Sequence, residues 1–213
     1  MPERSSYITL ISEGRSEQVI KRSRFIARAA HADDKTAAEV FRSSVREAMH
    51  GARHNPAAFV LGSSSELIWS TDDGEPQGTA GAPILSAITS SDVTFVVVVV
   101  TRYFGGIKLG TAGLAEAYEK SAKLAIEAAG ICRVEERSIF SCVANYKAYN
   151  KIESISSASG LFTVNATNYG EDVKFNVSFA PGLDEDVISA LKTASNGQIR
   201  FNSQWKDLVN FTI

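Results

Sequence analysis

The segment Thr94-Phe-Val-Val-Val-Val-Val-Thr-Arg-Tyr-Phe-Gly-Gly-Ile-Lys-Leu-Gly-Thr-Ala-Gly113 carries the strongest structural signal in the chain. Residues 94–100 are β-branched or apolar at every position, so they predict a central strand that is covered on both faces. After a glycine-rich turn, residues 111–129 are rich in Ala, Leu, Glu and Lys and predict a long helix that ends at Gly130. The N-terminal half is therefore expected to be built around a strand, a tight turn and a helix.

The glycine-rich turn in this segment is a candidate anion site. Backbone N–H groups and the helix dipole attract an anion at a helix start, and two cations flank this one. The predicted anion- or nucleic-acid-binding residues are Arg102, Gly105, Gly106, Lys108, Gly110 and Thr111. The G-x₄-G spacing is that of a P-loop, but Thr111 and Ala112 replace its lysine and its magnesium-binding hydroxyl, which argues against NTP hydrolysis. The alternative is that the glycines only allow the helix to pack closely on its sheet.

A second loop, residues 70–83, places three carboxylates close together. Asp72, Asp73 and Glu75 are separated only by Gly74, and the loop contains three glycines and two prolines. Oxygen-rich loops can hold Mg²⁺ or Ca²⁺, but the EF-hand spacing is absent and we assign no metal. The alternative is a polar turn. Because this loop and the glycine-rich turn are both unusually elaborate, we expect them to lie side by side.

His54, in the segment Ala52-Arg-His-Asn-Pro-Ala-Ala-Phe59, is one of three histidines in the chain. A histidine just before a strand can be a general base or a ligand. The alternative is a histidine that only makes a local hydrogen bond.

A basic segment precedes these loops at residues 21–28. Read as a strand, it directs Arg22, Arg24 and Arg28 to one face, where three guanidinium groups could hold phosphates. The alternative, which we favour, is a solvated strand face or a charged edge strand.

The periodicity of the rest of the chain completes the expected elements. In the first half, residues 36–49 predict an amphipathic helix with Val40 on its apolar stripe, residues 57–61 and 67–70 a pair of strands, and residues 83–91 a short helix. After residue 137 the pattern is strand, helix, two strands, helix and strand, which is the order of a ferredoxin-like βαββαβ unit. This second half contains no histidine and no glycine-rich loop, so we expect no chemistry there.

Composition limits the class of protein. Apolar residues make up 44% and charged residues 22% of 213 residues, as in ordinary globular proteins, and the net charge of −2 does not indicate nucleic-acid binding by bulk charge. The longest apolar run, Phe95–Val100, is far shorter than the roughly 20 residues of a membrane span, and no secretory signal is visible. Cys132 and Cys142 are too few for a disulfide framework. We expect a cytoplasmic protein with reduced thiols, no cofactor and no membrane contact.

Four motifs along the chain together resemble a known family. They are Lys21-Arg-Ser-Arg-Phe-Ile26, Ala52-Arg-His-Asn55, Asp72-Asp-Gly-Glu-Pro76 with Gly78-Thr-Ala-Gly81, and Val99-Val-Thr-Arg-Tyr-Phe-Gly-Gly-Ile-Lys-Leu-Gly110. Through them the chain is similar to the IMPACT family, in particular its bacterial members, from about residue 20 to 125. Residues 138–213 resemble the small second domain of those members. Ala112 is a departure, since many members have glycine there.

The resemblance implies an α+β protein of two domains, residues 1–134 and 135–213. The first is expected to have the fold shared by a small-subunit ribosomal protein, the fourth domain of elongation factor G and some small-molecule kinases. The second is expected to be ferredoxin-like, as is the fifth domain of that factor. Eukaryotic relatives are translational regulators.

Two functions remain open. The one we favour is a non-enzymatic regulatory protein that binds RNA, the ribosome or a translation factor, which predicts that Arg22, Arg24, Arg28, Arg102 and Lys108 converge on one face. The other is an enzyme acting on a small phosphorylated or carboxylated metabolite, which predicts one pocket lined by His54, Asp72, Asp73, Glu75, Arg102 and the turn at residues 105–113. The sequence does not separate them, because both use the same loops.

Overall fold

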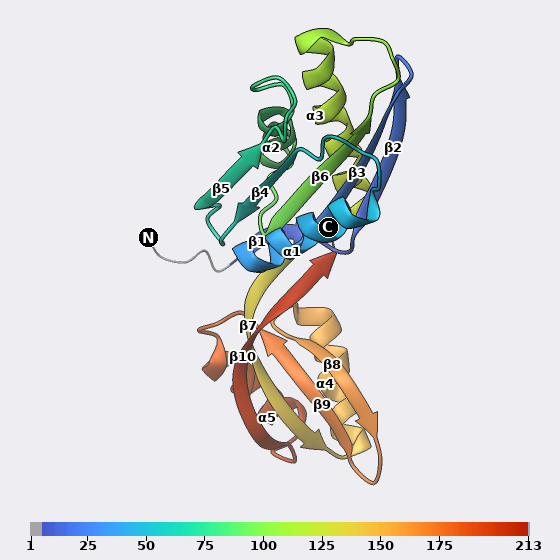
Figure 1. The fold of residues 1–213 in the computed structure, drawn as a ribbon. Coiled ribbons are helices and arrows are strands. Elements are labelled where there is room, and N and C mark those ends of the chain that lie inside the picture. The colour runs from blue at the N-terminus through green and yellow to red at the C-terminus, as the bar shows by residue number, and fades with distance from the viewer. Residues whose placement is uncertain (1–5, 213) are drawn as a thin grey trace. The chain divides into compact units, whose positions relative to one another are not determined.

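The computed structural model describes residues 6–212, and the chain divides into two compact units (Figure 1). Unit 1 contains the described residues up to Val134 together with residues 210–212, and unit 2 is Glu135–Val209. Both units combine helices and strands, so the protein has the expected α+β character. That each unit folds by itself remains a prediction. Among residues 6–212, none of the helices combines the length and the apolar character that a bilayer-crossing segment needs.

A five-stranded antiparallel sheet forms the centre of unit 1. In spatial order its strands are β2 (Gly14–Ile20), β3 (Ser23–His31), β6 (Val96–Tyr103), β4 (Ala57–Leu61) and β5 (Leu67–Thr71). The prediction of a central, doubly covered strand is confirmed, because β6 pairs with β3 and β4 and the side chains of Val96–Val100 are at most 1% exposed.

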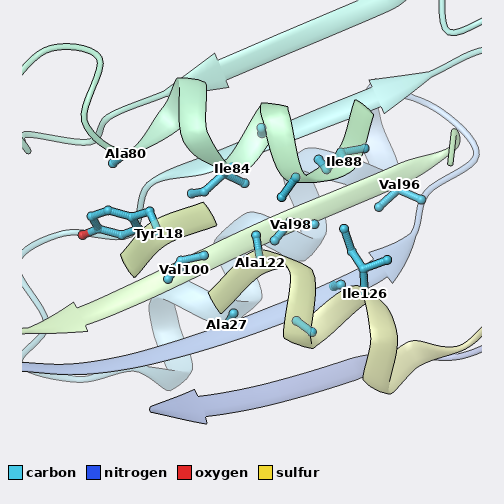
Figure 2. Packing of buried hydrophobic residues seen from close by; sticks show 14 of the residues in the cluster. Ala27, Ala80, Ile84, Ile88, Val96, Val98, Val100, Tyr118, Ala122 and Ile126 are labelled. Carbon is cyan, nitrogen blue, oxygen red and sulfur yellow. The ribbon is translucent and has the colours of Figure 1, made fainter. Parts of the chain in front are cut away.

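Helices cover both faces of this sheet. On one face, Val96, Val98 and Val100 belong to a core cluster with residues of α2 (Gly81–Ser90) and α3 (Gly110–Ala129), as Figure 2 shows. On the other, Val97 and Val99 pack with residues of α1 (Lys35–Ala48). The three helices lie close to their predicted limits. The prediction that Val40 lies on the buried apolar stripe of α1 is wrong, because Val40 is 64% exposed. Ala38, two residues earlier in the helix, is buried.

The basic segment at residues 21–28 is only partly a strand. Lys21 and Arg22 have φ angles of 45° and 65° and form the turn of the β2–β3 hairpin, so the prediction that Arg22 lies on the strand face is wrong. Nor is β3 an edge strand, since β2 lies outside it. Strand β2 was not predicted because its inward side chains are polar: Ser16 and Gln18 donate to the carbonyl oxygens of Ser121 and Ala117 of α3, at 2.9 and 3.3 Å. Such a strand shows no apolar alternation.

Unit 2 has the predicted element order. The elements are β7 (Ile131–Ala144), α4 (Tyr146–Ser159), β8 (Thr163–Tyr169), β9 (Val173–Phe179), α5 (Asp184–Ala194) and β10 (Arg200–Thr212), and the strands lie in the order β10-β7-β9-β8. Residues 131–134 at the start of β7 belong to unit 1, and the short strand β1 (Ser6–Leu10), which was not predicted, pairs with β7. Phe140, Phe175, Ile152, Val187 and Leu191 form the centre of a separate core. The two cysteines are free and buried.

Candidate functional site

Four segments of unit 1 that are far apart in the sequence surround one pocket of about 770 Å³. The segment before β4 contributes His54, the loop after β5 contributes Glu75, the end of β6 contributes Arg102, and the start of α3 contributes Lys108–Thr111. The two elaborate loops therefore lie side by side, as predicted. The pocket is open to a ligand at the end of the sheet where β6 passes into α3.

A buried ion pair forms the floor of this site. Nη1 of Arg102 lies 2.8 and 3.0 Å from the two carboxylate oxygens of Glu75, and the two side chains are only 8% and 3% exposed. The hydroxyl of Tyr118, from α3, donates to Oε1 of Glu75 at 2.7 Å. Burial, followed by the contact with Glu75, raises the pKa of Tyr118 far above its usual value, so this hydroxyl stays protonated. Arg102 was predicted as an anion-binding cation; instead Glu75 neutralises its charge inside the protein.

Asp72 organises the loop and does not line the pocket. Its carboxylate accepts hydrogen bonds from the backbone N–H groups of Gly78, Ala80 and Gly81 at 2.8, 3.0 and 2.8 Å. Burial raises the pKa of Asp72, but these three donors outweigh it and bring the pKa below its ordinary value. Since the N-cap residue Ala80 has no capping side chain of its own, Asp72 caps α2 from a distance. Its role is structural, as the polar-turn alternative proposed.

Asp73 is also directed away from the pocket. Oδ2 of Asp73 accepts from the backbone N–H of Asn55 at 2.7 Å, and Asp73 lines a separate cavity of about 180 Å³ together with Arg42 and Arg46 of α1. The prediction that Asp72, Asp73 and Glu75 share one pocket is therefore wrong. Within residues 6–212, no group of His, Cys, Asp and Glu side chains is arranged to hold a metal ion.

His54 has a defined orientation at the pocket wall. Nδ1 lies 2.9 Å from the backbone carbonyl oxygen of Asp73. Because a carbonyl oxygen can only accept, Nδ1 carries the proton, and in the neutral ring Nε2 is a hydrogen-bond acceptor. No described residue is hydrogen-bonded to Nε2. The local hydrogen bond that we considered as an alternative exists, and it leaves the other nitrogen available to a ligand.

Among the described residues, no N-cap side chain satisfies the backbone N–H groups at the start of α3. The N-cap residue Leu109 makes no side-chain hydrogen bond, and the first turn contains no acidic residue. Leu109, Gly110 and Thr111 line the pocket together with the exposed Lys108. In addition, Nε of Arg102 is buried without a hydrogen-bond partner among the described residues. Buried donors without acceptors are rare in native proteins and indicate an ion, a water or a ligand.

Gly105, another predicted binding residue, has a structural role. Gly105 packs against the β2–β3 turn: a Cβ there would lie 1.9 Å from the carbonyl oxygen of Arg22, and its N–H donates to Oγ of Ser23 at 3.2 Å. Neither Gly105 nor Gly106 is among the residues that line the pocket.

The predicted arginine cluster does not form. Arg24 pairs with Glu17 at 2.6 Å, and this hydrogen bond lowers the pKa of Glu17. Arg28 pairs with Glu13 at 2.5 Å. Both are neutralised by acidic residues of the hairpin. Arg22, Arg24 and Arg28 are all absent from the pocket wall, so the five cations do not converge there.

The sequence analysis missed Tyr118 and assigned no role to Phe104. Tyr118 lies among the apolar residues of α3, and the only available signal was its hydroxyl, which requires a partner when buried. Phe104 lines the pocket and is 60% exposed, an unusual position for a phenylalanine.

The sequence of this chain is similar to those of known proteins. Residues 21–126, which include the whole pocket, match the family model of the Impact N-terminal domain. IMPACT family member YvyE of Bacillus subtilis is 36% identical over 170 residues, which span 80% of this chain and 78% of that protein. IMPACT family member YigZ of Escherichia coli is 48% identical over 101 residues, which span 46% of this chain and 50% of that protein. The chain belongs to the IMPACT family.

A solved structure has a similar fold over most of the chain. It is described as the crystal structure of a hypothetical protein, is 30% identical in sequence, and superposes with a TM-score of 0.61 over 93% of this chain and 97% of that chain. This agreement supports the mixed α+β two-unit fold. It assigns no activity to the pocket.

Proposed function

We propose that this protein is a regulatory RNA-binding protein linked to translation, and that the pocket of unit 1 holds a phosphate group of the RNA. The observation that carries this proposal is the set of unused donors on one pocket wall. Three features lie at or beside this wall: the uncapped start of α3, the exposed Lys108 and the unpaired Nε of Arg102. A helix start with free N–H groups binds phosphate, and a nearby lysine strengthens the field.

Family and fold support the link to translation. The eukaryotic members of the IMPACT family are translational regulators. The strand order β10-β7-β9-β8 of unit 2 and its βαββαβ element order support the analogy with a ferredoxin-like domain, and the antiparallel sheet of unit 1 supports the analogy with the fourth domain of elongation factor G. The pocket chemistry supports the proposal independently of these analogies.

Binding of a short single-stranded RNA at several salt concentrations tests this function. Wild type should bind, with affinity falling steeply as salt rises, and Lys108→Ala should weaken binding and reduce the slope of log Kd against log salt by about 1. Lys120→Ala is the matched control, because Lys120 is an exposed lysine of α3 outside the pocket. Equal affinity of wild type and Lys108→Ala contradicts the proposed site. Binding of an acidic polypeptide in place of RNA would favour a protein partner.

The orientation of His54 favours a second candidate function, an enzyme acting on a small anionic metabolite. When Nε2 is unprotonated, it can accept a proton from a substrate whose anionic group is held by the hydrogen-bond donors of the pocket. A mixture of phosphorylated and carboxylated metabolites followed by ³¹P and ¹H NMR would test this. Conversion by wild type and not by His54→Ala supports an enzyme, and no conversion of any metabolite in the mixture counts against this candidate.

A further inference from the structure

The pocket contains more than a phosphate site requires. Phe104 is 60% exposed at the pocket wall, and the guanidinium carbon of Arg102 lies 5.4 Å from the centre of its ring. The cation therefore helps to hold the ring in place. An exposed aromatic ring in a basic site is a platform on which a nucleic-acid base can stack.

His54 adds a requirement of a different kind. The ionised phosphate group of an ester or diester has acceptors only, and in the neutral ring of His54 the free Nε2 is an acceptor too, so the two do not bind each other. Nε2 needs a ligand group that donates, such as a hydroxyl or an N–H. The hydrogen bond from Nδ1 to Asp73, at 2.9 Å, holds the ring in this tautomer. The ligand that satisfies the pocket thus carries an anionic group, a flat ring and a donor.

The size of the pocket agrees with such a ligand. Its volume of about 770 Å³ is far larger than one phosphate and lies within the roughly 300–1,000 Å³ of small-molecule sites. Part of the wall is apolar, from Pro76, Leu109 and Leu114.

We infer that the pocket is a ribonucleotide site. The phosphate lies at the start of α3 beside Lys108, the base stacks on Phe104, and a ribose hydroxyl or a base N–H donates to Nε2 of His54. This inference rests on the proposed phosphate site and adds the class of ligand. The nucleotide has two possible sources with the same chemistry, a free ribonucleoside monophosphate or the phosphorylated end of an RNA chain.

Calorimetric titration of the full chain separates the contributions of the phosphate, the ribose and the base to binding. The probes are inorganic phosphate, ribose 5-phosphate, AMP, UMP, and a short RNA with either a 5′-phosphate or a 5′-hydroxyl. AMP and UMP should bind more tightly than ribose 5-phosphate, and ribose 5-phosphate at least as tightly as phosphate. Preference for the 5′-phosphorylated RNA over AMP identifies an RNA end as the source, and the reverse preference identifies a free nucleotide.

Two variants test the assigned contacts. Phe104→Ala should raise the Kd of AMP by roughly 5- to 150-fold, the range expected for loss of one base–aromatic stack, and leave the Kd of inorganic phosphate unchanged. Ile107→Ala is the matched control, because Ile107 is a 41% exposed apolar residue of the same loop that does not line the pocket. His54→Ala should weaken the binding of AMP and of ribose 5-phosphate and leave the binding of inorganic phosphate unchanged.

The outcomes distinguish this inference from the proposed function. If phosphate and RNA bind in a Lys108-dependent manner but AMP binds no more tightly than phosphate, the ribonucleotide site is wrong and the phosphate site stands. Equal effects of Phe104→Ala and Ile107→Ala also overturn the stacking contact. If none of the probes binds, both are wrong.

Discussion

Glu75 and Arg102 form a buried ion pair that joins the loop after β5 to the end of β6, with Nη1 of Arg102 2.8 Å from Oε1 of Glu75. Tyr118 adds a hydrogen bond from α3 to the same carboxylate oxygen. Three elements that form the pocket are therefore tied together at one carboxylate. The pair explains how the loop, the strand end and the helix keep their positions.

Removal of one member of this pair should be costly. Glu75→Ala leaves the guanidinium of Arg102 buried and unpaired, which typically costs about 3–5 kcal/mol of unfolding free energy. Chemical denaturation of wild type and variant measures the loss. Glu119→Ala is the control, because Glu119 pairs with Lys123 at 2.7 Å on the exposed side of α3, where such pairs contribute about 1 kcal/mol or less. Similar losses in both variants would show that the buried pair has no special role.

Asp72→Asn should destabilise unit 1 in a pH-dependent way. The substitution removes the carboxylate that accepts three N–H groups and costs about 1–3 kcal/mol at neutral pH. Since the pKa of Asp72 is lower in the folded state than its ordinary value of 3.8, its contribution is complete above that value and is lost as the pH falls through the folded pKa. The difference between wild type and variant should be constant near neutrality and shrink below about pH 4. Asp92→Asn is the control, because Asp92 is exposed, and its stability should not differ from that of wild type. A stability difference between wild type and Asp72→Asn that persists at low pH would contradict the charge-based explanation.

Gly105, in the turn before α3, and Gly113, inside α3, should respond in opposite directions to alanine. Gly105→Ala forces a Cβ to within 1.9 Å of a carbonyl oxygen and should cost about 1–3 kcal/mol. Gly113 lies inside α3, where a Cβ would meet Leu109 at an ordinary 3.4 Å, so Gly113→Ala should stabilise the protein by about 0.5–1 kcal/mol. Thermal denaturation of both variants measures the shifts. Destabilisation by Gly113→Ala would mean that this helix start tolerates no added group.

Unit 2 should fold on its own. A fragment of residues 136–213 contains every residue of the second core, from Phe140 to Ile199, and should unfold cooperatively. Since residues 210–212 cluster with unit 1, a fragment that ends at residue 209 should melt at nearly the same temperature. Circular dichroism during heating makes the comparison. The absence of a cooperative transition in the longer fragment would contradict an independent domain.

Local sequence predicted the elements with strong periodicity. The apolar run that became β6 and the Ala-rich segment that became α3 were recognisable because β6 is buried on both faces and α3 buries one face along its length. The order of unit 2 was recognisable because elements such as β9 and α5 present an apolar face at their own period. Among the failures were β2, whose inward side chains bond to α3 through polar groups, and Arg22, which the hairpin turn takes out of the strand.

The sequence by itself determined which residues carry chemical groups and that two elaborate loops belong to one region. Only the tertiary structure decided what each group does, because hydrogen-bond partners come from distant segments. Asp72, Asp73 and Glu75 are nearly adjacent, but Asp73 and Gly74 have φ angles of 43° and 86°, and the tight turn sends the three carboxylates to α2, to Asn55 and to Arg102. Arg24 and Arg28 look like a phosphate-binding face in the sequence, but β2 places Glu17 within reach of Arg24, and Glu13 just before it within reach of Arg28. A charge becomes available for binding only where the fold leaves it without an internal partner.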